Sequence, residues 1–175
     1  MDRLGPGLAM LALAVVLAAL MWIGWRGRLK RQSGIPAPRP VPEAAGAERY
    51  RCSGQYVVTT TAGDWLDRVA VHGLGVRTDA DAVVLEEGVA FDRSGAGAFF
   101  IPREDLQDVG LASGMAGKFV EKDGLVVVGW LLGETAVETG FRPRYAEEKK
   151  ALVAAIENVM GSAAGRAAGQ GKSEQ

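Results

Sequence analysis

The chain has 175 residues, with 20 Lys and Arg, 21 Asp and Glu, one cysteine and a formal net charge of −1. The charge is uneven, because residues 50–160 carry 11 basic and 17 acidic side chains, whereas residues 1–49 are net basic. An acidic domain repels phosphate backbones, which argues against nucleic acid as a partner. The lone cysteine, Cys52, excludes an internal disulfide and fits a reducing compartment.

Residues 1–25 are predicted to form a short N-terminus and one transmembrane helix. No charged residue occurs in the 22 positions from 4 to 25. A helix of that length measures about 33 Å, enough to cross a hydrocarbon core of about 30 Å. Interfacial tryptophans and then a basic cluster end the segment, so the residues predicted to anchor and orient the chain are Trp22, Trp25, Arg26, Arg28, Lys30 and Arg31.

The basic cluster also predicts the orientation. Positive charge is retained on the cytoplasmic side, so the C-terminal domain is expected in the cytoplasm and the N-terminus outside the cell membrane. A cleaved signal peptide is the alternative. It is disfavoured because its positive charges would precede the apolar run rather than follow it.

Residues 26–49 are predicted to be a basic stop followed by a Pro-rich linker. Proline occupies positions 36, 38, 40 and 42, an alternation that favours an extended polyproline II spacer holding the domain off the membrane.

Residues 50–160 are predicted to form one domain of about seven short strands and a C-terminal helix, which is a mainly β, α+β fold. Alternating β-branched and apolar runs indicate strands at 56–61, 65–71, 83–85, 89–91, 98–101 and 135–141. Residues 118–120 and 125–132, joined by Asp123-Gly124, are predicted to pair as a hairpin. Residues 145–160 have helical periodicity through Leu152, Ile156 and Val159, and Gly161 is expected to end that helix. Residues 161–175 are small and polar and are predicted to be disordered.

Four segments carry a resemblance to a known family. They are Gly88-Val-Ala-Phe-Asp-Arg, Phe100-Ile-Pro-Arg-Glu-Asp-Leu, Gly124-Leu-Val-Val-Val-Gly-Trp-Leu and Glu138-Thr-Gly-Phe-Arg-Pro-Arg. The chain resembles small actinobacterial single-pass membrane proteins that carry a bacterial pleckstrin-homology (PH)-like domain. The resemblance implies a half-open barrel of two sheets, closed at one end by the helix. It implies no catalytic residues and no cofactor.

Candidate chemical groups are sparse. The inositol-lipid version of this fold uses a basic cluster in its first strand-loop-strand; here Arg51 and Arg68 stand beside Asp64 and Asp67, so inositol-lipid binding is not expected. His72 has no nucleophile in sequence motif with it, and a surface histidine is the favoured interpretation.

Two acidic pairs and one arginine pair are the remaining candidates for a metal or anion site. The acidic pairs Asp79/Asp81 and Asp105/Asp108 do not match a calcium loop. Arg142 and Arg144 offer an anion site at the start of the helix, with ordinary surface charge as the favoured alternative. We therefore predict no catalytic, metal-binding or cofactor-binding residues.

The function predicted from these features is a membrane-anchored cytoplasmic PH-like binding or scaffold module, non-catalytic, whose partners are the lipid bilayer and an unknown protein. The alternative is an accessory subunit of a membrane transport or export complex that contacts its partner through the transmembrane helix. A membrane-bound enzyme is the third hypothesis.

Overall fold

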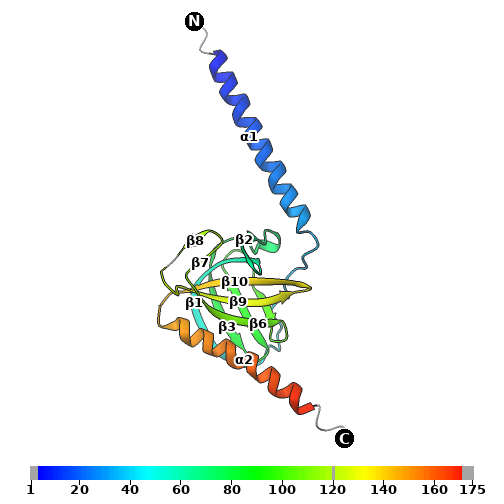
Figure 1. The fold of residues 1–175 in the computed structure, drawn as a ribbon, viewed down its shortest axis with the longest axis vertical. Coiled ribbons are helices and arrows are strands. Elements are labelled where there is room, and N and C mark those ends of the chain that lie inside the picture. The colour runs from blue at the N-terminus through cyan, green and yellow to red at the C-terminus, as the bar shows by residue number, and fades with distance from the viewer. Residues whose placement is uncertain (1–3, 120, 171–175) are drawn as a thin grey trace. The chain divides into compact units, whose positions relative to one another are not determined.

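The computed structural model describes residues 4–119 and 121–170. The chain divides into two compact units, Met1–Gly34 and Ile35–Gln175. The first unit holds one helix, α1 (Leu4–Arg31), and the second holds the strands and a second long helix, α2 (Glu148–Gln170) (Figure 1).

The second unit is built on one antiparallel sheet. Within the described residues its strands run in the order β5-β4-β3-β1-β10-β9-β6, with β2 added to β1. A separate two-stranded ribbon pairs β7 with β8. The strand bounds are β1 (Glu48–Thr61), β2 (Asp64–Arg68), β3 (Thr78–Leu85), β4 (Gly88–Arg93), β5 (Phe99–Pro102), β6 (Leu106–Ala112), β7 (Gly114–Met115), β8 (Lys118–Phe119), β9 (Leu125–Leu132) and β10 (Thr135–Pro143). The predicted mainly β fold with a C-terminal helix is confirmed.

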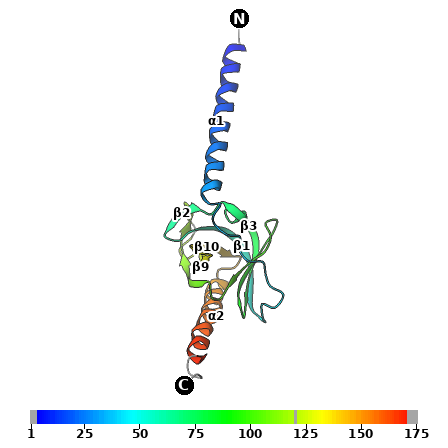
Figure 2. The same cartoon turned by 90° about the vertical axis from the view of Figure 1, so that its right-hand side faces the viewer.

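The long strand β1 joins the two halves of the sheet. Its first part pairs with β3, its second part pairs with β10, and the ladder shifts register between Tyr56 and Val58. An extra residue of this kind bends a strand and increases its twist, so the sheet curls around the core (Figure 2). Gly54 sits at the crossing, where a side chain would collide with the carbonyl of Arg142.

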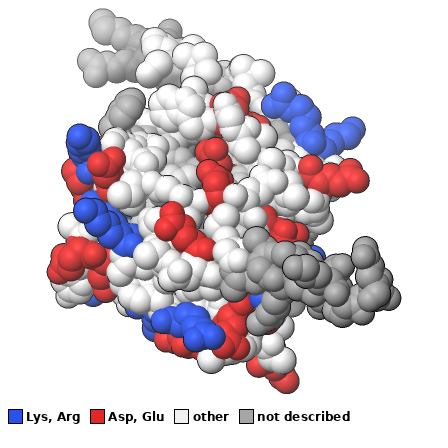
Figure 3. Space-filling view, turned by 60° about the horizontal axis from the view of Figure 1, so that its bottom comes forward, with Lys and Arg blue, Asp and Glu red and all other residues white. Residues whose placement is uncertain are grey.

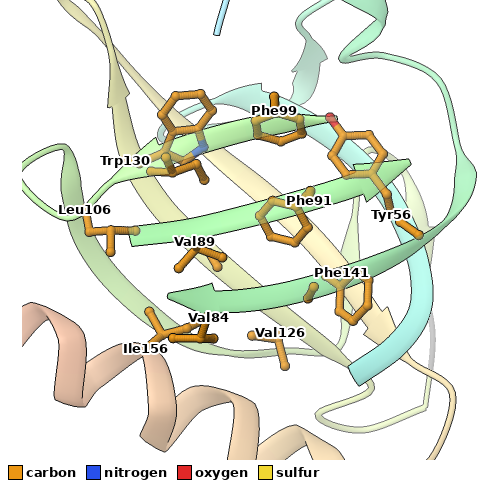
Figure 4. Packing of buried hydrophobic residues seen from close by; sticks show 14 of the residues in the cluster. Tyr56, Val84, Val89, Phe91, Phe99, Leu106, Val126, Trp130, Phe141 and Ile156 are labelled. Atoms are coloured by element: carbon orange, nitrogen blue, oxygen red, sulfur yellow. The ribbon is translucent and has the colours of Figure 1, made fainter. Parts of the chain in front are cut away.

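The core lies between the two halves of the curled sheet (Figure 4). Alternate residues of each strand point inward, and their aromatic rings form a connected group. Phe91 and Phe99 stack with ring centroids 5.3 Å apart, and Phe99 and Trp130 with centroids 6.0 Å apart. Burying each such side chain contributes roughly 1.5–3 kcal/mol, so this group accounts for much of the hydrophobic stabilisation.

Helix α2 closes one end of the barrel. Leu152, Ile156 and Val159 repeat at helical spacing and are buried in the same cluster as the inward-facing strand residues. Figure 4 shows Ile156 pointing from α2 toward the side chains of the sheet. The predicted apolar stripe is therefore the face that packs on the core.

The predicted hairpin between residues 118–120 and 125–132 is wrong. Strand β8 pairs with β7, while β9 pairs with β6 on one side and β10 on the other. Strand β6 was not predicted because apolar and polar residues do not alternate clearly along it. Gln107 and Asp108 are both exposed, and Gly110 has no side chain. Val120 lies outside the described residues.

The ends of the second unit also differ from the expected boundaries. Helix α2 continues to Gln170, whereas the sequence predicted a stop at Gly161 and disorder beyond it. Each glycine costs a helix only about 1 kcal/mol relative to alanine, and the glycines at 161, 165 and 169 are separated by residues rich in alanine, the best helix former. Residues 171–175 lie outside the described residues.

Residues 35–47, here called the strap, were predicted to be part of a free spacer but pack against the sheet. The backbone N–H of Phe100 donates to the carbonyl of Arg39 at 2.8 Å, and the N–H of Glu87 donates to the carbonyl of Ala45 at 3.1 Å. Ala45 is buried with Phe100 and its neighbours, and Ile35 packs against the main core. The alternating prolines favour an extended chain without internal hydrogen bonds, and such a chain can lie along a strand.

Candidate functional site

Four buried side chains of the barrel, Trp130, Thr139, Thr59 and Tyr56, form one continuous chain of hydrogen bonds. Trp130 Nε1 donates to Thr139 Oγ1 at 2.9 Å, and Thr139 and Thr59 share a hydrogen bond of 2.7 Å between their hydroxyls. The Tyr56 hydroxyl lies 2.7 Å from Thr59 Oγ1 and donates to the carbonyl of Leu74 at 2.7 Å. If each group donates to the next in the order Trp130, Thr139, Thr59, Tyr56 and the carbonyl of Leu74, every donor in the chain has an acceptor. The network therefore ties β9, β10 and β1 together, and it leaves none of these groups free for chemistry.

Arg93 is a buried cation with a structural role. Its guanidinium and Nε donate to the carbonyls of Gly73, Ala96 and Gly97 at 2.9–3.0 Å. The same guanidinium lies 4.9 Å from the ring centres of both Tyr56 and Phe99. These contacts fix the two loops at one end of the barrel.

The single histidine and the single cysteine both have structural surroundings. His72 is exposed, has a positive φ of 57°, and its Nε2 lies 2.8 Å from the carbonyl of Ile35, so it fastens the strap. Cys52 is buried, and burial raises the pKa of its thiol to about 12. A thiol that stays protonated near neutral pH is a poor nucleophile, because the thiolate is the reactive form.

The acidic pairs do not assemble into a metal site. Asp81 lies 3.5 Å from Arg51, and Asp105 lies 3.6 Å from Arg39. Among the described residues, no group of three or more His, Cys, Asp or Glu side chains is placed to hold a metal ion.

The basic residues of the first strand-loop-strand do not converge. Arg51 is engaged by Glu48 at 2.8 Å, and Arg68 donates to the carbonyl of Ala116 at 3.0 Å. On the face shown in Figure 3, Lys and Arg side chains are interspersed with Asp and Glu rather than gathered into one basic area. Trp65 is 41% exposed on β2, whereas Trp130 is buried.

One edge of the sheet, β5, is covered by the chain itself. Phe100 pairs with Ala90 of β4 on one side and forms a bridge with Arg39 of the strap on the other. Pro38 and Pro40 flank Arg39 and have no N–H to offer. The strap thus ends hydrogen bonding at this edge, one of the ways by which proteins prevent edge-to-edge association.

The opposite edge, β6, has no such cover within the described residues. Its pairing partner in the sheet is β9, so about half of its N–H and C=O groups face away from the ladder. Gln107 and Asp108 are exposed, and Leu111 is 39% exposed. Helix α2 packs beside this strand. Strand edges of this kind accept an added strand in known peptide-binding domains.

The anchor residues lie on α1. Residues Pro6–Gly27 are long and apolar enough to cross a membrane, a test that a signal sequence near the N-terminus also passes. The rings of Trp22 and Trp25 are exposed, and the guanidinium of Arg26 lies 5.9 Å from the Trp22 ring centre. Lys30 and Arg31 follow in the last turn, and the side chain of Arg28 lies outside the described part of the chain. The anchoring role of these residues stays a prediction.

Comparison with known proteins identifies the domain. The family model described as "Bacterial PH domain-like" matches residues 35–157, more than half of the chain. The chain belongs to this family. The match begins at Ile35, so it includes the strap of this bacterial PH-like domain. No curated protein matches the sequence.

Solved structures with a similar backbone are distant. A chain of "The 8S snRNP Assembly Intermediate" aligns with a TM-score of 0.48 and 10% identity, over 70% of this chain and 89% of that one. A structure of Vav1 inhibited by an allosteric inhibitor aligns with a TM-score of 0.42 and 16% identity, over 77% of this chain and 33% of that one. The C-terminal domain of an unknown protein from Leishmania infantum aligns with a TM-score of 0.39 and 12% identity, over 80% of this chain and 98% of that one. Likenesses at this level say nothing about the function of this chain.

Proposed function

We propose that this chain is a non-catalytic binding module, anchored in the cell membrane by α1 with its PH-like domain in the cytoplasm, that recognises an extended segment of another protein at the β6 edge. The observation that carries the proposal is the contrast between the two edges. The strap closes β5, whereas β6 keeps unpaired backbone groups in the described structure.

The surroundings of β6 indicate what kind of segment it accepts. Added strands gain affinity from main-chain hydrogen bonds and specificity from side-chain contacts. Leu111 offers an apolar contact, and Asp105 and Asp108 make the other end of the strand acidic. The complementary segment is extended, with an apolar residue opposite Leu111 and a basic residue toward Asp108.

The absence of catalytic function is supported by the state of the residues that chemistry would need. Cys52 is buried with a raised pKa, and His72 is engaged by the strap backbone. The hydroxyls of Tyr56, Thr59 and Thr139 are hydrogen-bonded to one another in the core.

Photo-crosslinking in cells tests the binding edge. A crosslinking amino acid replaces Gln107 on β6, and the matched control replaces Ser94, an exposed turn residue away from this edge. We expect an adduct with a protein from position 107 and none from position 94. Leu111→Lys should abolish the adduct, and Val41→Lys should preserve it, because Val41 has the same 39% exposure but lies on the strap. An adduct that survives Leu111→Lys would refute binding at β6.

The same experiment separates the alternative, an accessory subunit that binds its partner through α1. Ala14 and Ala18 stand four residues apart on this helix, a spacing that permits close helix packing. A crosslinker at Leu13 that captures a partner, combined with no adduct from position 107, would favour this alternative.

A fusion reporter tests the orientation. The proposal places the C-terminus in the cytoplasm, because basic residues follow the apolar segment. A reporter that is active only outside the cytoplasm, fused after Gln175, should give no signal. A strong signal would reverse the assigned topology.

A further inference from the structure

A cavity of about 400 Å³ lies where β10 ends and α2 begins. Three cationic side chains line it, Arg142, Arg144 and Lys149, together with the carboxylates of Asp79 and Glu121. Cavities of roughly 300–1,000 Å³ are the usual size for small-molecule sites. The lining residues come from three strands, one turn and a helix, so the fold brings together side chains that are far apart in the sequence.

The sheet register explains why these side chains meet. Gln55 of β1 stands opposite Arg142 of β10 on one side and Asp79 of β3 on the other. Neighbouring residues of a strand point to opposite faces, and Tyr56 points into the core, so Gln55 and its two partners form a row on the outer face. Lys149 reaches the same cavity from the start of α2 and is half-buried.

Glu121 already occupies part of this cationic site. Its Oε2 accepts a hydrogen bond from Arg142 Nη2 at 2.9 Å. Its own backbone N–H and the Arg142 side chain, with the charges of Arg142 and Lys149, hold the pKa of the Glu121 carboxyl below its usual range. A carboxylate and a phosphate attract the same charge-assisted donors. Glu121 is exposed, so an anionic ligand can compete with it for those donors.

The charges around the cavity match a dianion once Glu121 moves aside. Three cations against two carboxylates leave a net charge of +1, and without Glu121 the net charge is +2. A phosphomonoester carries about −1.5 to −2 near pH 7. Within the described part of the chain, Arg142 has an ion pair with Glu121, whereas Arg144 and Lys149 have none. In the described structure both cations therefore border the cavity without an ion pair, and Arg144 also borders a second cavity lined by Asp79, Asp81 and Asp92.

We propose that this cavity binds a phosphomonoester group, held by Arg144 and Lys149 and by Arg142 after the ligand displaces Glu121. The three cations lie at the end of β10 and near the start of α2, whereas inositol-lipid binding was considered, and not expected, for the basic residues of the first strand-loop-strand. Glu121 then acts as an internal competitor that keeps affinity low until a ligand of sufficient charge enters.

A titration with inorganic phosphate tests the site. The full-length chain is placed in phosphatidylcholine nanodiscs, and its thermal unfolding midpoint is followed as phosphate replaces chloride at constant ionic strength. Losing one charge-assisted hydrogen bond costs on the order of 1.4 kcal/mol, or roughly tenfold in affinity. We therefore expect Lys149→Ala and Arg144→Ala to raise the apparent Kd about tenfold, and Glu121→Gln to lower it.

Lys150→Ala is the matched control. It removes the same charge from the neighbouring, exposed position of the same helix, which does not line the cavity. Its Kd should equal that of the unmodified chain. Equal weakening by Lys150→Ala and Lys149→Ala, or an unchanged Kd in Glu121→Gln, would overturn the proposal. Lys149→Arg keeps the positive charge and should retain binding, which would show that the loss in Lys149→Ala comes from the missing charge and not from a folding defect.

A second arm separates a free phosphorylated molecule from a lipid headgroup. Phosphatidic acid offers a phosphomonoester headgroup, so nanodiscs containing it are compared with nanodiscs containing phosphatidylserine. If the headgroup is the natural source, phosphatidic acid saturates the site and removes the response to free phosphate in the unmodified chain. If a free molecule is the source, the response persists in both lipids. A response in neither lipid refutes the site.

Discussion

Shortening Ile156 to alanine should cost the domain about 2–5 kcal/mol of folding free energy, the range for truncating a well-packed core residue. The Ile156 side chain is 0% exposed and lies in the same cluster as Val84 and Val126. The change removes three carbon groups, and at about 0.8 kcal/mol per buried CH₂ the transfer part alone is about 2.4 kcal/mol. The remainder is the cost of the cavity left behind. This loss is a large share of the roughly 5–15 kcal/mol expected for a whole domain.

Urea unfolding of a fragment covering residues 35–161, followed by tryptophan fluorescence, measures the effect. The buried Trp130 reports on the core. Asn158→Ala, on the exposed face of the same helix, is the control and should change stability by less than about 0.5 kcal/mol. A loss of that small size for Ile156→Ala would mean that α2 does not close the barrel in solution. The urea dependence should be the same in both variants, because a change in it would indicate altered compactness rather than lost packing.

Three further outcomes are expected. A fragment beginning at residue 48 should be less stable than one beginning at residue 35 and should self-associate in size-exclusion chromatography, because it exposes the β5 edge and the face that Ala45 covers. Thr139→Val should cost about 1–3 kcal/mol in urea unfolding because it leaves the Trp130 N–H without an acceptor, while Thr135→Val at the strand end should be nearly neutral. Burial raises the pKa of the Cys52 thiol from 9.0 to about 12, so the stability that the protonated thiol contributes is fully present below pH 9 and is lost as the pH rises toward 12. The free energy of unfolding of Cys52→Ala should therefore fall less steeply between pH 9 and pH 12 than that of the unmodified chain.

Some elements could be predicted from the sequence because local pattern and final packing agree. The Glu86-Glu87-Gly88 turn joins two short apolar runs, and β3 and β4 pair around it with Leu85 opposite Gly88. The helical stripe of α2 was visible because its polar positions separate the buried ones clearly. In both places the residues adjacent in sequence are the ones that decide the structure.

Other elements depend on partners that a local pattern does not show. Strand β6 is an edge strand, so only part of its length is buried and its alternation is weak. Trp65 and Trp130 look equivalent as single residues. Trp130 lies in a central strand covered on its inner face, whereas Trp65 lies on β2, which pairs only with the end of β1 within the described sheet. Of the residues that line the cavity near α2, Arg142 and Arg144 could be singled out from the sequence. Lys149 and Glu121 join them only because α2 and the turn before β9 pack beside the end of β10.

The strap was misjudged because the same composition fits two states. Alternating prolines favour an extended chain in solution and equally on a strand edge, where their missing N–H groups stop further pairing. Deciding between these states requires knowing that Phe100 presents a free N–H to Arg39 and that Val83 and Ala90 leave an apolar surface for Ala45. These features arise only when β3, β4 and β5 have assembled.

The position of the strap also limits how far the domain can lie from its proposed anchor. Helix α1 ends at Arg31 and the folded domain begins at Ile35, so four steps of at most about 3.6 Å connect them, or about 14 Å in total. The interfacial layer on each side of a bilayer is itself about 5–8 Å thick. If α1 spans the membrane, the residues between Arg31 and Ile35 are therefore too few to form the long spacer that was expected from residues 26–49.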